Sequence, residues 1–244
     1  MFKFILLILF LLCTANLTTT QNQFETDDII TSSGNLKITF IGHGTLIFTF
    51  NEKIIHIDPY GRLADYTALP KADIILITHE HGDHFDQKVI KILRTEKTSL
   101  ILTKNCAKNI SGGIVLKNGD IQTVQGLMIE AVPAYNIIHK RDNGEPFHPQ
   151  EIGNGYIITF GDKRVYVAGD TENIPEMEEL GEIDIAFLPM NLPYTMTPEM
   201  IADAARMIKP QILYPYHYGN TDTSKLVRLL KGDQDIEVRI RKME

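Results

Sequence analysis

One short run of residues constrains this chain more than any other: Thr78-His79-Glu80-His81-Gly82-Asp83-His84. It follows the apolar run Ile74–Ile77, which predicts a buried strand, and precedes residues 85–93, which predict a helix. Packing alone does not explain these side chains, because each buried imidazole needs a hydrogen-bond partner. In open sheets, loops at the carboxyl ends of strands converge on ligands. The run therefore predicts a metal site at the end of a central strand.

Further candidate ligands stand at the ends of other predicted strands. His148 precedes a hairpin, Asp170 follows it, and His217 follows a late strand. Together with the histidine run they give five histidines and two carboxylates: His79, His81, Asp83, His84, His148, Asp170 and His217. This set suits two adjacent divalent cations, which Asp170 can bridge through its carboxylate oxygens. Imidazole and carboxylate ligands without thiolate fit zinc, and also manganese, iron or nickel.

The remaining pattern predicts an α+β fold. Strands are predicted at residues 36–40, 46–50, 54–58, 74–77, 99–103, 128–132, 156–160, 164–168, 185–188, 212–213 and 237–240, with shorter ones near 114 and 121. Helices are predicted at residues 85–93, 198–208 and 224–230, with a short one near 107. Hairpins run through the first half, and strands alternate with helices in the second. This order suggests two sheets packed face to face with helices outside.

The amino-terminal residues predict export. Residues 1–20 combine a basic start with an apolar run and resemble a signal peptide, so we expect a secreted or periplasmic protein. If uncleaved, the segment would anchor the chain in a membrane, whereas no stable membrane span is expected in the mature chain. Residues 21–35 are polar and predict a flexible leader, which places the folded domain at residues 36–244.

The charge of the chain limits its expected partners. The formal net charge is −7 at pH 7, and there is no long basic run. Because phosphate neutralisation dominates affinity for duplex nucleic acid, no nucleic-acid partner is expected. We expect a small-molecule or lipid-like substrate instead, and the sequence leaves the oligomeric state open.

Three motifs resemble the metallo-β-lactamase-fold hydrolase superfamily: His79-x-His81-x-Asp83-His84, Ala168-Gly169-Asp170-Thr171 and Pro215-Tyr216-His217-Tyr218. They occur in the same order as in that superfamily. The chain is most similar to its compact branch, which includes ascorbate-phosphate lactonase-like proteins and N-acyl phosphatidylethanolamine phospholipases. The resemblance implies an αββα sandwich of two mixed β-sheets flanked by helices, with a binuclear metal site at one edge of the sheets.

The resemblance also implies how the ligands divide between two metals. The first metal would be bound by His79, His81 and a third histidine. The second would be bound by Asp83, His84 and His217, and Asp170 would bridge the two. These assignments are carried over from the superfamily by motif position.

The third histidine departs from the superfamily pattern. Many relatives have it directly after the strand that corresponds to residues 128–132, where this chain has Ala134-Tyr135-Asn136. His148 and His139 are both candidates. His148 is favoured because it leads into the next strand as in similar members, whereas His139 is expected to be a solvated loop residue.

Three residues outside the motifs are expected near the site or in the core. His43, in a Gly-His-Gly turn, is expected to face the pocket. His56 fits a place beside the metal ligands and a place in the core equally well. Asp58 resembles the superfamily's strand-end aspartate, which would hold a ligand imidazole by a hydrogen bond and raise its basicity.

These features together predict a metal-dependent hydrolase. Two cations would lower the pKa of a shared water, and the resulting hydroxide would attack an ester, a lactone or a phosphodiester. Asp83 and Asp170 are the candidate catalytic residues, and either Asp83 or a metal-bound water would pass a proton to the leaving group. A di-iron redox enzyme on the same scaffold and a non-catalytic exported metal-binding protein are the alternatives. Residues 60–70 and 133–154 are expected to form the pocket.

Overall fold

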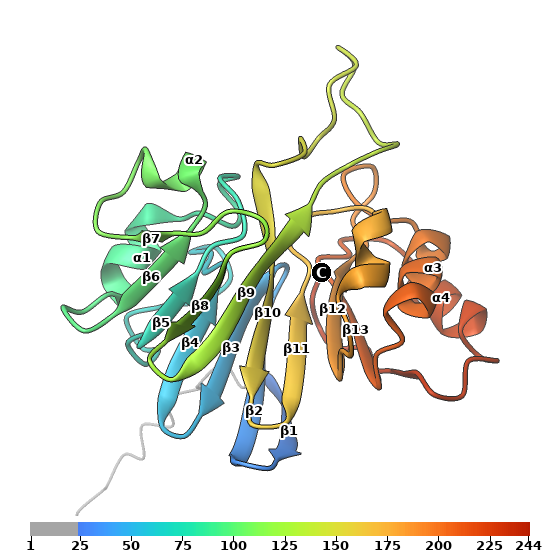
Figure 1. Ribbon diagram of the computed structural model, residues 1–244. Coiled ribbons are helices and arrows are strands. Elements are labelled where there is room, and N and C mark those ends of the chain that lie inside the picture. Colours follow the sequence, from blue (N-terminus) through green and yellow to red (C-terminus); the bar gives the residue numbers. More distant parts are fainter. Residues whose placement is uncertain (1–23) are drawn as a thin grey trace, which may run out of the picture.

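The computed structural model describes residues 24–244, so the predicted signal peptide at residues 1–20 lies outside the described residues. Two seven-stranded sheets pack face to face, and the helices lie outside them (Figure 1). The predicted αββα sandwich is therefore confirmed. None of the helices within residues 24–244 has the length and apolar composition that a membrane crossing requires.

Each half of the chain builds one sheet, and the two sheets have the same topology. The strands of the first sheet lie in chain order: β1 (Glu25–Thr31), β2 (Gly34–Gly42), β3 (Thr45–Phe50), β4 (Lys53–Ile57), β5 (Ile74–Leu76), β6 (Ser99–Leu102) and β7 (Ile114–Val115). Those of the second sheet do the same: β8 (Ile121–Val124), β9 (Leu127–Ala134), β10 (Gly153–Phe160), β11 (Lys163–Val167), β12 (Ile185–Pro189), β13 (Ile212–Tyr216) and β14 (Glu237–Val238). In both sheets the first three strand pairs are antiparallel and the last three are parallel.

The helices are short and follow the parallel strands. They are α1 (Gln87–Leu93), α2 (Lys104–Ala107), the 3₁₀ helix η1 (Pro175–Glu179), α3 (Pro198–Ile208) and α4 (Thr223–Leu229). Helix α3 has the predicted bounds, because Thr197 caps it through a bond from the Met200 N–H and Pro198 occupies its first position. It ends where Lys209 adopts a left-handed conformation with φ of 53°.

Strand β5 is buried on both faces, which fixes the position of the loop that follows it. Ile74 and Leu76 lie in the core between the two sheets, whereas Ile75 and Ile77 pack with α1 in a second core. Each of these side chains is fully buried. Full burial of one aliphatic side chain contributes about 1.5–3 kcal/mol. The continuous apolar run is thus the signature of a strand covered on both sides.

The flexible leader predicted for residues 21–35 is wrong from Glu25 onward. Residues Glu25–Thr31 form strand β1, which pairs antiparallel with β2 across the whole strand. Asp27 in β1 accepts two hydrogen bonds of 2.7 Å from Nη2 of Arg241, near the end of the chain. The stretch is polar because β1 is an edge strand, with most of its side chains in contact with solvent. The folded domain therefore begins earlier than predicted.

Candidate metal centre

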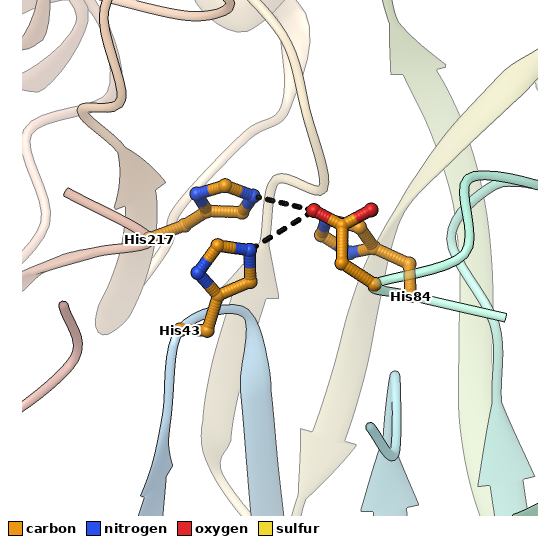
Figure 2. Close-up of side chains that lie close together, drawn as sticks. His43, His84 and His217 are labelled. Carbon is orange, nitrogen blue, oxygen red and sulfur yellow. Dashed lines mark hydrogen bonds and ion pairs between the residues drawn. The ribbon is translucent and has the colours of Figure 1, made fainter. Parts of the chain in front are cut away.

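Loops from both sheets bring two groups of potential ligands to one edge of the sandwich. The first group is His79, His81, His148 and Asp170, and the second is His43, Asp83, His84 and His217. Within each group the candidate ligand atoms lie within 4.8 Å of one another. All seven ligand candidates predicted from the sequence are in these groups, and His43 is an addition. His43 faces the site as expected, and Figure 2 shows its ring beside that of His217, with His84 facing both.

Asp170 belongs to the first group but also lies close to histidines of the second. Its Oδ2 atom is 3.3 Å from Nε2 of His148, 3.6 Å from Nε2 of His217 and 3.9 Å from Nε2 of His79. Its Oδ1 atom is 3.6 Å from Nε2 of His84. The carboxylate therefore reaches histidines of both groups, which is the position that a bridging ligand needs.

The backbone at the second group is held in an unusual conformation. His43 and His217 have φ values of 52° and 46°, in the left-handed region. The His217 N–H donates to the carbonyl oxygen of His43 at 2.9 Å, which ties the β2–β3 turn to the end of β13. Between His43 and the next strand, Gly44 leaves room for His84, because a Cβ there would lie 2.8 Å from Cε1 of that ring. Strained backbone of this kind is concentrated at functional sites.

Three histidines are fixed through their Nδ1 atoms. Nδ1 of His84 lies 2.8 Å from Oδ2 of Asp58, as predicted for that aspartate. Nδ1 of His79 lies 3.0 Å from the Thr78 hydroxyl, which itself donates to Asp58 at 2.5 Å. Nδ1 of His148 lies 2.6 Å from Oδ1 of Asn136. A proton on Nδ1 satisfies each contact and leaves Nε2 free to accept a cation.

Three of the ligand atoms that face the centre have no hydrogen-bond partner within the described residues. Nε2 of His84, Nε2 of His217 and Oδ1 of Asp170 are buried and make no hydrogen bond. Leaving such groups unpaired costs about 1–3 kcal/mol each. Their convergence, and the choice of imidazole and carboxylate, fit divalent cations between the two groups.

The side chains of the centre strongly shift one another's pKa values. Burial, together with the neighbouring His84, holds the pKa of His79 well below its usual range. Burial also disfavours a charged His84, but the Asp170 and Asp58 carboxylates outweigh it and raise the pKa of His84 to about 9. Burial would raise the pKa of Asp170, but His217 and His84 hold it well below its usual range. The bridging candidate is therefore ionised at neutral pH.

The two histidines whose place was left open lie in different surroundings. His148 belongs to the first group, whereas His139 pairs with Glu172, with 2.7 Å between Nδ1 and Oε1. The expectation that His139 is solvated is wrong, because Glu172 holds it and its side chain is only 22% exposed. His56 lies in the core, where its Nε2 atom contacts the carbonyl oxygen of Pro70 at 3.1 Å.

A cavity of about 470 Å³ opens in front of the two groups. Its walls include His81, Asp83, Asp170 and Tyr194, together with two residues that the sequence did not single out, Arg141 and Asn191. The segment 133–154 contributes to it as expected, but none of the lining residues belongs to residues 60–70. The volume is in the range of sites for small molecules.

The chain is similar in sequence to a known protein family and to several of its members. Residues 37–217 match the family model described as the β-lactamase superfamily domain. The chain is 32% identical over 198 residues to the UPF0173 metal-dependent hydrolase of Pelotomaculum thermopropionicum, which covers 75% of this chain and 84% of that protein.

Solved structures agree with this match. A crystal structure from Parabacteroides distasonis, described as a candidate metal-dependent hydrolase, has a TM-score of 0.87 and 53% identity, covering 91% of this chain and 100% of that one. Igni18, a metallo hydrolase from Ignicoccus hospitalis, has a TM-score of 0.70 and 26% identity, covering 86% of this chain and 96% of that one. The chain therefore belongs to the β-lactamase superfamily and is a metal-dependent hydrolase with the metallo-β-lactamase fold.

Proposed function

We propose that this protein is a binuclear hydrolase of ester, lactone or phosphodiester bonds that uses two divalent cations, with zinc favoured. One observation carries the proposal: buried ligand atoms of His84, His217 and Asp170 converge without partners between two groups of four ligands. A protein that bound one structural cation would have no use for the second group. We also propose that the chain is exported, as its amino-terminal residues predict.

The two groups would hold one cation each. His79, His81 and His148 would bind the first, Asp83, His84 and His217 the second, and Asp170 would bridge them. When bound, the cations supply Lewis acidity and lower the pKa of water toward neutrality. Nε2 of His43 lies 3.0 Å from Oδ2 of Asp83, so His43 would either steady that carboxylate or bind the second cation itself.

Asp83 is suited to transfer a proton to the leaving group. Its side chain is 37% exposed and lines the cavity, whereas Asp170 is only 5% exposed. Burial would raise the pKa of Asp83, but the imidazoles of His217, 3.7 Å away, and His43, 3.0 Å away, outweigh it and lower the pKa well below its usual range. The carboxylate is thus ionised and a weak base at neutral pH, so it would hold a proton only transiently, and its exposure to the cavity would let that proton pass to the leaving group.

Metal analysis combined with a substrate panel tests this function. The purified protein should contain two equivalents of metal and hydrolyse at least one ester, lactone or phosphodiester. Asp170→Asn should lose metal and activity, whereas Asp235→Asn, which removes the same charge at an exposed position, should retain both. Wild-type activity in Asp170→Asn would refute the binuclear mechanism. Bound iron with a redox-active spectrum would favour the di-iron alternative, and tight metal binding without hydrolysis would favour a metal-binding protein.

A further inference from the structure

The cavity in front of the metal centre contains one guanidinium, that of Arg141. It stands in the hairpin at residues 139–147, within the long connection between β9 and β10 that projects from the edge of the sandwich (Figure 1). The Arg141 N–H donates to the Glu145 carbonyl oxygen at 2.7 Å, and the Gly144 N–H donates to the Arg141 carbonyl oxygen at 2.9 Å. The hairpin therefore has a defined turn that places the arginine at the cavity.

The hairpin is fixed to the same framework as the ligands. The buried Glu172 carboxylate accepts bonds from the backbone N–H groups of Ile138 and His139 at 2.7 and 2.6 Å. Glu172 follows Asp170 by two residues, and it also accepts a bond of 3.1 Å from Asn136, which holds His148. The position of Arg141 is consequently linked to His148 and Asp170, two ligand candidates of the first group.

The Arg141 side chain is oriented but not neutralised. Its Nη2 atom donates to the carbonyl oxygen of Phe147 at 3.2 Å, and its Cζ atom lies 5.1 Å from the centre of the Phe147 ring. Within residues 24–244, no carboxylate forms an ion pair with it. Most of its N–H donors are therefore available to a ligand, in the planar fork that matches carboxylate and phosphate oxygens.

The balance of charge in the cavity also favours an anion. Asp83 and Asp170 are the carboxylates among the lining residues. Two divalent cations would outweigh their charge, and Arg141 adds a further positive charge to the cavity wall. A neutral substrate would leave this guanidinium unused inside the site.

We propose that the cavity selects substrates that carry an oxyanionic group, a carboxylate or a phosphate, beside the bond that is cleaved, and that Arg141 binds this group. The inference rests on the proposed function and specifies its substrate class. A hydrogen bond to a charged partner contributes about 1.5–3 kcal/mol, which corresponds to a tenfold to hundredfold change in affinity.

Calorimetric titration of the zinc-loaded protein tests the anion site without requiring turnover. The probes are glutarate, as a carboxylate, and glycerol phosphate, as a phosphate. Arg141→Gln should weaken binding of one or both by about tenfold to a hundredfold, and Arg141→Lys should be intermediate because it keeps the charge but loses the fork. Lys140→Gln removes the same charge from the adjacent, exposed position and should bind both probes like wild type. The probe that is affected identifies the type of anion.

Hydrolysis of matched esters gives an independent reading. The ratio of kcat/KM for p-nitrophenyl hemiglutarate to that for p-nitrophenyl butyrate should fall at least about tenfold in Arg141→Gln if the anion is a carboxylate. Unchanged binding of both probes in Arg141→Gln would overturn the inference. If that variant loses anion binding but the wild type hydrolyses no substrate, the anion site stands and the proposed hydrolytic function fails.

Discussion

Replacing Asp58 with asparagine should weaken cation binding in both ligand groups at once. Oδ2 of Asp58 accepts from Nδ1 of His84 at 2.8 Å and from the Thr78 hydroxyl at 2.5 Å, and that hydroxyl is 3.0 Å from Nδ1 of His79. One carboxylate oxygen thereby fixes a histidine in each group. An amide nitrogen in its place donates instead of accepting, so both rings would shift their proton from Nδ1 to Nε2. The atoms that face the centre would then be blocked.

The size of the effect follows from this geometry. Loss of the partner that orients a ligand histidine weakens metal affinity by about tenfold to a hundredfold. This corresponds to about 1.4–2.8 kcal/mol for each cation. Because Asp58 serves one histidine directly and the other through Thr78, both binding constants should fall. A residue that supported only one histidine would change only one constant.

Zinc titration against a competing chelator measures the two constants. Thr78→Val is the matched control, because it removes the link to His79 and leaves the Asp58–His84 contact in place. It should weaken one cation, whereas Asp58→Asn should weaken two. Circular dichroism of both variants checks that the fold is retained. Two cations bound with wild-type affinity by folded Asp58→Asn would refute the reasoning.

Three further predictions concern packing, acid stability and the edge strand. Gly44→Ala should displace the His84 ring and reduce metal content, whereas Gly82→Ala, whose Cβ would contact nothing within 4 Å, should not; elemental analysis of both checks this. Burial lowers the pKa of His56 from 6.5 to about 4, so the unfolded state binds more protons than the folded state between these pH values. The free energy of unfolding therefore decreases as the pH is lowered from about 6.5 to 4. The pH dependence of urea unfolding should therefore lose about 3 kcal/mol of amplitude between pH 7 and 4 in His56→Gln, and an unchanged amplitude would contradict this. Asp27→Asn should lower the free energy of unfolding by about 2 kcal/mol, because it weakens the contact with Arg241 that joins β1 to the end of the chain; thermal unfolding measures this, and an unchanged melting temperature would contradict it.

The sequence was informative about the ligands because strand ends were easy to locate. The apolar run before His79 and the hairpin before Asp170 place both residues at carboxyl ends of strands, where the topology brings loops together. The choice of His148 over His139 depended on resemblance, and the structure places His148 among the ligand candidates. Their roles as metal ligands remain predictions until a metal is measured.

Other features depend on contacts that no local pattern reveals. The polar stretch at Glu25–Thr31 forms a strand because β2 and Arg241 offer it partners that are distant in sequence. Asn136 and Glu172 hold the long connection through bonds between segments more than thirty residues apart. Arg141 belongs to a loop whose path is set by these bonds, so its place at the cavity could not be predicted from sequence alone.

The repeated topology of the two sheets gives corresponding carboxylates different tasks. Asp58 follows β4, the fourth strand of its sheet, and Asp170 follows β11, the fourth strand of the other. The first stands behind the imidazoles and sets their protonation, while the second stands among them as a ligand candidate. Each ligand group combines residues from both halves of the chain, so neither half contains a complete group. Cation capture should therefore be a property of the docked pair of sheets, and separated halves should not retain it.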